Sequence, residues 1–281
     1  MMNRMARYIP GFLFVFTSML MSCENENEPL LKNISFGTQV EEMQSRAPFV
    51  DNEEDEDDFN TFAVWGNYNG NQPVFTNQEV HRSTSQPTGV WDYSPSKSWN
   101  MAADSYVFSA YSPYGVGTPT VVNNLLTSLT FDSNAHPVDL MLAYTPVEKE
   151  DIGKTVVPTF NHALGAVNFT FKLKSGFNYV NTYRVTGVQL DNVYTSGLFE
   201  LNNDNTITPS TTGTPGKTNT ITSFTGLAFT ISQAMTSDYL FVIPQQSAVA
   251  TLRLTLDVNG ESVELTKENF ERLEQLPINF I

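Results

Sequence analysis

The sequence predicts an all-β fold built from β-sandwiches, and three observations support that prediction. Short segments rich in β-branched and aromatic residues follow one another along the chain, separated by turn residues. Several of these segments alternate apolar and polar residues with the period of a half-buried strand. In the first half of the chain, no stretch of ten or more residues keeps an apolar period of 3.6, so we expect helices to be minor elements.

Composition narrows the class of protein. The 281 residues are 40% hydrophobic and 12% aromatic, which is enough to fill a core and excludes a disordered chain. The formal net charge is −15, and a nucleic-acid binder needs clustered Lys and Arg to contact phosphates, so nucleic acid is excluded as a partner. The single cysteine excludes disulfide frameworks and thiolate metal clusters.

Residues 1–22 are typical of an export signal. Arg4 and Arg7 precede an apolar stretch, residues 11–21, that has the length of a signal peptide and is too short to span a bilayer. Cys23 ends the sequence Leu-Met-Ser-Cys, which resembles a bacterial lipobox, and the acidic residues after it resemble surface-export signals of Gram-negative lipoproteins. We therefore expect a lipoprotein of the outer membrane at the cell surface. An ordinary signal peptide with an unrelated cysteine is the alternative.

A tether and a first strand are predicted within residues 23–46. Ile34, Phe36, Thr38 and Val40 fall on one face of an extended chain, and the residues between them are polar or small. If Ile34, Phe36 and Val40 are buried, each contributes about 1.5–3 kcal/mol to stability. The strand would thus form an integral part of the first sandwich.

The remaining chain is expected to divide into an N-terminal sandwich, residues 47–152, and a C-terminal sandwich, residues 153–281. The acidic run at 51–58 repels itself and is predicted to be a solvated loop, with a calcium site as the alternative. Residues 202–219, rich in Asn, Thr, Pro and Gly, are predicted to be an exposed loop. The predicted strands after the first are 62–68, 73–78, 90–93, 106–111, 128–131, 140–144, 167–174, 184–193, 197–201, 227–231, 239–244 and 251–258, the last joined through Asn259-Gly260 to 261–265.

A family resemblance emerges from six short motifs that follow one another in order. They are Trp91–Pro95, Trp99, Tyr106–Pro113, Asp139–Met141, Phe160–Phe169 and Phe241–Gln246. Together they look like the fimbrillin family, the lipoprotein pilins (type V pili) of anaerobic Gram-negative bacteria. The resemblance implies two tandem transthyretin-like β-sandwich domains and export as a lipoprotein. It also implies removal of an N-terminal strand by an arginine-specific protease and assembly by strand donation.

This mechanism can be placed on the sequence. The bond between Arg46 and Ala47 matches the family's maturation position, and a surface arginine of no special role is the alternative. Cutting there would detach the strand of Ile34, Phe36 and Val40 and leave an apolar groove with unpaired edges, which a strand of another subunit could fill. The expected partners are other fimbrial subunits, outer-membrane lipid through Cys23 before processing, and a host or bacterial surface ligand.

The C-terminus departs from the family pattern. Residues 268–281 lack the Trp and the Gly-Lys-x-Tyr segment typical of members that polymerise, and Phe270, Leu273 and Leu276 favour a helical turn. A tip subunit, an accessory subunit and a truncated pilin are therefore alternatives to a shaft pilin.

No catalytic pattern was found in the sequence, so we expect no enzyme, no cofactor and no metal. His81, His136 and His162 lie far apart without zinc-binding spacing, and nucleophile-elbow, phosphate-loop and dinucleotide fingerprints are missing. His162 is expected to be a packed or capping side chain. Paired carboxylates of a glycoside hydrolase leave no sequence pattern, so a hydrolase is the third candidate.

The rival candidate is a surface glycan-binding lipoprotein of the outer membrane. Exposed, coplanar aromatic side chains would stack on sugars, whereas buried ones favour a pilin. The aromatic residues to be tested in this way are Trp65, Trp91, Tyr93, Trp99, Tyr111 and Tyr114.

Overall fold

The fold comes from a computed structural model that describes residues 32–40, 59–83, 90–173, 183–225, 235–245, 250–266 and 278–280. The leader, Cys23, the Arg46–Ala47 bond, the acidic run at 51–58 and the strand predicted at 227–231 lie outside these residues. The compact unit that contains the described residues is Lys32–Ile281.

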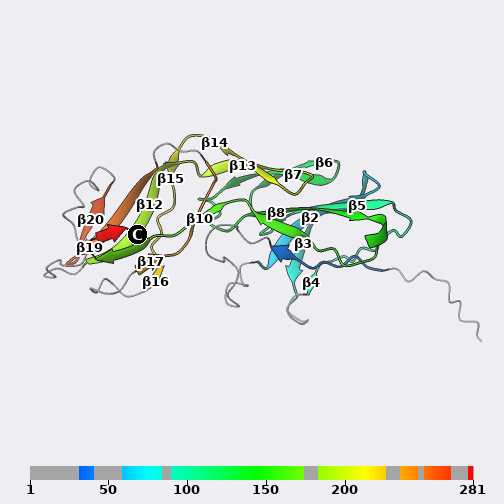
Figure 1. Cartoon of the computed structure of the whole chain (residues 1–281), viewed down its shortest axis with the longest axis horizontal. Helices are drawn as coiled ribbons and strands as arrows, with labels where there is room; N and C mark the ends of the chain where they lie inside the picture. The colour runs from blue at the N-terminus through cyan, green and yellow to red at the C-terminus, as the bar shows by residue number, and fades with distance from the viewer. Residues whose placement is uncertain are drawn as a thin grey trace, which may run out of the picture. The chain divides into compact units, whose positions relative to one another are not determined.

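The all-β class is confirmed. The described residues form 21 strands and one 3₁₀-helix, η2 (Lys149–Asp151), and none of them lies in an α-helix (Figure 1). No helix in this part of the chain has the length and hydropathy needed to cross a membrane.

A seven-stranded sheet is the centre of the first half, and both of its faces are buried. Along β2, Phe62 and Val64 belong to one core, while Ala63 and Trp65 belong to another on the opposite face. In spatial order its strands are β1 (Gln39–Val40), β9 (Thr159–His162), β8 (Met141–Glu148), β5 (Ser105–Ser112), β2 (Thr61–Tyr68), β3 (Gln72–Arg82) and β4 (Trp91–Asp92).

A four-stranded sheet belongs with the second of these cores, where Leu129 and Phe199 are fully buried. Its strands in order are β14 (Ile207–Thr212), β13 (Ser196–Leu201), β7 (Leu125–Asp132) and β6 (Thr118–Val122). The pairing of β7 with β13 joins strands from both sides of residue 152. The division of the chain into domains at that residue stays a prediction.

The C-terminal part contains a third core, which includes Val185, Leu254 and Leu256. One four-stranded sheet there consists of β15 (Gly216–Lys217), β12 (Tyr183–Val193), β19 (Thr251–Val258) and β20 (Glu261–Leu265). The other consists of β16 (Phe224–Thr225), β17 (Met235–Ser237), β11 (Thr170–Leu173) and β21 (Ile278–Phe280), and β10 (Gly165–Val167) pairs with β18 (Leu240–Val242). The hairpin predicted at Asn259-Gly260 is confirmed, because both residues have positive φ and join β19 to β20.

Two sequence predictions are wrong. Residues 202–219 are not a loop throughout, because they contain β14 and β15, and β14 pairs with β13 along its whole length. An edge strand is held by main-chain hydrogen bonds, so its polar composition did not reveal it. The single strand expected over 167–174 is two, since β10 and β11 belong to different sheets and separate at Asn168 and Phe169.

Candidate functional site

The candidate functional site is residues 32–40, which we call the leading segment (blue in Figure 1), together with the groove that it fills. Its alternation is confirmed: Ile34 and Phe36 are 2% and 4% exposed and Val40 is half-buried, whereas Ser35 and Gln39 are exposed. The core that takes up these side chains is the one on the face of the seven-stranded sheet opposite Leu129 and Phe199.

The leading segment is bonded along both of its edges. On one edge the Ile34 amide donates to the Lys97 carbonyl at 2.8 Å, and the Trp99 amide donates to the Lys32 carbonyl at 2.9 Å. We call residues 93–99 the strap.

On the other edge, the Gly37 and Gln39 amides donate to the carbonyls of Val156 and Pro158, and the Val156 amide donates to the Ser35 carbonyl. β1 then continues this edge by pairing with β9 in parallel. The strap follows β4 and Val156 precedes β9, so the leading segment bridges the two ends of the seven-stranded sheet. It closes the wall around this core, much as the last strand closes a barrel.

Phe36 occupies a cage of four aromatic rings, which we call the ring cage. Its ring centroid lies 5.7 Å from that of Phe62, 5.5 Å from Phe75, 5.7 Å from Tyr93 and 6.0 Å from Phe108. Three of the four contacts are edge-to-face, which is a favoured geometry for aromatic pairs. Phe62, Phe75 and Phe108 come from the neighbouring strands β2, β3 and β5, so the sheet fixes their positions.

Tyr93 contacts the leading segment twice. Its ring packs against Phe36, and its hydroxyl donates to the Ile34 carbonyl at 2.6 Å. Burial raises the pKa of Tyr93 above its ordinary value of 10.0, although a hydrogen bond with the Lys97 backbone acts in the opposite direction. The hydroxyl is therefore neutral and able to donate at physiological pH.

The structure brings the three residues predicted for the removable strand into one core but does not test whether the strand is removed. Cys23, Arg46 and Ala47 lie outside the described residues, so lipidation and processing stay predictions. The sequence analysis missed the strap and the ring cage. The family motif Trp91–Pro95 contains Tyr93, but nothing in the sequence shows which segment that tyrosine would contact.

His162 is a packed side chain, as expected. Its Nδ1 lies 2.6 Å from Oδ2 of Asp139, and the imidazole side chain is 6% exposed. His136 packs beside the ring of Phe131. Across the described ranges, no three His, Cys, Asp or Glu side chains come together as they would around a metal ion.

The aromatic residues considered for glycan stacking are mostly inside the protein. Trp65, Trp91, Trp99 and Tyr111 are at most 6% exposed. Tyr93 is engaged by the leading segment, and Tyr114 is 36% exposed. These six side chains therefore form no exposed, coplanar platform for a sugar.

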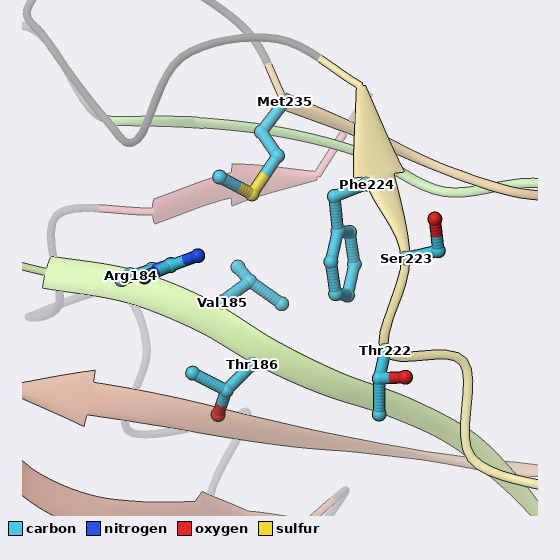
Figure 2. Close-up of a pocket in the computed structure, with 7 residues that line it drawn as sticks. All are labelled: Arg184, Val185, Thr186, Thr222, Ser223, Phe224 and Met235. Carbon is cyan, nitrogen blue, oxygen red and sulfur yellow. The ribbon is translucent and has the colours of Figure 1, made fainter.

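A cleft of about 570 Å³ opens in the C-terminal part, at the third core. Figure 2 shows Val185, Phe224 and Met235 facing a common space, with Arg184 at its side. The cleft begins beyond the point where Val188 and Ile221 exchange main-chain hydrogen bonds. Arg184 is the single charged residue among its described lining, which offers no pair of groups for acid–base chemistry.

Comparison with known proteins agrees with the fold. The sequence profile of the fimbrillin-like family matches residues 45–275. No curated protein matches the sequence. Among solved structures, a Bacteroides ovatus protein with a proposed role in cell adhesion is 15% identical, with a TM-score of 0.54 over 84% of this chain and 86% of its own. A Bacteroides uniformis protein of the same description is 16% identical, with a TM-score of 0.52 over 83% of each chain.

Proposed function

Because the chain belongs to the fimbrillin-like family, we propose that it is a structural or accessory subunit of cell-surface fimbriae, a pilin or adhesin. As a member of that family it is a structural protein and not an enzyme. In this proposal it is exported as a lipoprotein through Cys23, cut after Arg46, and assembled with other subunits by β-strand donation.

The observation that carries the proposal is the place of the leading segment in the wall of a core. Ile34 and Phe36 are buried, and burying such side chains contributes about 3–6 kcal/mol together. That contribution is comparable with the whole stability of a domain, about 5–15 kcal/mol. Loss of the segment would open an apolar groove with unpaired main-chain groups on both sides, at Lys97 and Val156 among others. An extended strand from a neighbouring subunit satisfies both needs.

Two other sheet edges are poorly suited to accept a strand. β6 and β14, the two outer strands of their sheet, carry Pro119 and Pro209, which pair with Leu129 and Phe199 at the same level of the sheet. Proline lacks the N–H that an added strand would need, so it discourages pairing at an edge. This contrast favours the groove as the acceptor.

The C-terminus is the donor that this chain best offers. The pattern Ile-x-Phe occurs twice in the sequence, at Ile34–Phe36 and at Ile278–Phe280. The second copy forms β21, the terminal strand at the edge of its sheet, where it pairs with β11 (red in Figure 1). A tip or accessory subunit would accept a strand in its groove and would not need a donor strand of its own.

The test is digestion of residues 24–281, the mature chain without the lipid-bearing Cys23, with an arginine-specific protease, followed by N-terminal sequencing and size analysis. We expect a new terminus at Ala47 and a ladder of oligomers. The variant Arg46→Lys is the matched control and should stay uncut at position 46 and monomeric. A chain lacking residues 278–281 should be cut without forming a ladder. A wild-type product that is cut yet stays monomeric would contradict a shaft role, and an uncut one would contradict maturation at Arg46.

A further inference from the structure

We infer that the ring cage is the specificity pocket of the groove, and that it selects incoming strands with an aromatic side chain at the position of Phe36. The inference rests on the proposed function and names the chemistry of the partner that the groove accepts: an extended peptide with the pattern of Ile34 and Phe36. Three features support it: the contacts between the rings, the close approach of Phe108 to Gly66, and the two contacts of Tyr93 with the leading segment.

The walls of the cage support one another as well as Phe36. The rings of Phe75 and Tyr93 are 5.1 Å apart and nearly perpendicular, and those of Phe75 and Phe108 are 6.2 Å apart. Three of the four rings therefore contact one another as well as Phe36. The space between the rings has the shape of one aromatic side chain, and an aliphatic side chain there would lose the edge-to-face contacts.

One glycine allows this arrangement. A Cβ at Gly66 of β2 would lie 2.6 Å from Cδ1 of Phe108, so the Phe108 ring can take its place only because residue 66 has no side chain. The Phe108 wall of the cage is thus set by two neighbouring strands, β2 and β5.

Tyr93 links two kinds of recognition. Its hydroxyl binds the main-chain carbonyl of Ile34, which any residue in an extended strand would offer. Its ring forms one wall around Phe36, which only a suitable side chain satisfies. A strand is therefore held in register by its backbone and chosen by its side chain at one position, and Tyr93 is a positioning residue for both.

Peptide exchange tests the inference. The mature chain carries a site for a sequence-specific protease substituted within residues 41–46, is cut there, and is mixed with fluorescent peptides of residues 32–40. The peptides are the native sequence, Phe36→Leu, Phe36→Ala, and the control Gln39→Ala, whose side chain is exposed in the native segment. Anisotropy gives each affinity, and near-ultraviolet circular dichroism confirms that the cut protein stays folded.

We expect the native and Gln39→Ala peptides to bind equally, and the Phe36→Leu and Phe36→Ala peptides to bind roughly 10-fold or more weakly. Protein carrying Tyr93→Phe should bind all peptides more weakly and keep the preference for Phe at position 36. Equal affinity of all four peptides would overturn the specificity inference and leave strand exchange intact. Failure of every peptide, native included, to bind the folded, cut protein would overturn strand exchange itself.

Discussion

Replacement of Phe36 by alanine is the sharpest test of the leading segment as part of the core. The ring is 4% exposed and has four aromatic neighbours, all within 6.0 Å between centroids. Truncating a buried phenylalanine costs about 3–5 kcal/mol, because transfer energy is lost and a cavity remains. Phe36 is held in a wall of rings that support one another, so the cavity should collapse little and the loss should fall in this range.

Intrinsic tryptophan fluorescence during urea unfolding provides the assay. The chain has three tryptophans, and two of them, Trp91 and Trp99, lie in the same core as Phe36. With a slope of about 2–3 kcal/mol per molar urea, the midpoint should fall by about 1–2 M in Phe36→Ala. The exposed neighbour Gln39 provides the matched control, and Gln39→Ala should shift the midpoint by less than about 0.2 M.

A loss below about 1 kcal/mol in Phe36→Ala would refute this reasoning. It would mean that the core around Trp91 and Trp99 is complete without the leading segment. The groove left by removing that segment would then be too shallow to drive the docking of another strand. Phe36→Leu should give an intermediate loss of about 1–2 kcal/mol, since it keeps most of the apolar volume and loses the ring contacts.

Two further substitutions test the walls of the groove. Because burial raises the pKa of Tyr93, the bond from its hydroxyl to Ile34 stabilises the fold fully below pH 10 and is lost as pH rises through the raised pKa. Tyr93→Phe should therefore lower the free energy of unfolding by about 1–2 kcal/mol at pH 8. In guanidinium titrations between pH 8 and 11, the variant should lose less stability than wild type. Parallel pH profiles of the two proteins would refute the stabilising role of the Tyr93 hydroxyl. Gly66→Ala should cost about 1–3 kcal/mol by displacing Phe108, whereas Gly216→Ala, where no atom lies within 4 Å of the added Cβ, should be neutral in the same titration. Equal midpoints for the two alanine variants would show that Phe108 moves freely.

The sequence was most informative where side-chain pattern alone decides structure. The alternation of Ile34 and Phe36 with polar residues identifies a half-buried strand, since a period of two has one physical interpretation. The turn at Asn259-Gly260 was predictable for a similar reason, because the residues that tolerate positive φ are few.

The sequence does not reveal which strands pair with each other. The parallel contact of β1 with β9 joins residues about 120 positions apart, and nothing in either segment specifies the other. The strap is another such case: Lys97 and Trp99 bind the leading segment through main-chain groups, which carry no sequence signal. The ring cage combines three strands with a loop residue, so it could be found only once the order of the strands was known.

The geometry of the leading segment explains how one peptide bond could control assembly. While the chain is intact, the segment is tethered beside its groove at an effective concentration that is in the millimolar range for short linkers. A strand from another subunit would have to compete against that concentration, so intact subunits should stay separate. After a cut at Arg46 the segment becomes an ordinary ligand, held by its hydrogen bonds and by two buried side chains, and it is diluted once it dissociates. A donor that belongs to a folded neighbour then gains from further contacts between the subunits. The cut would thus permit assembly by removing the high effective concentration of the tethered segment, and the groove itself would not need to change.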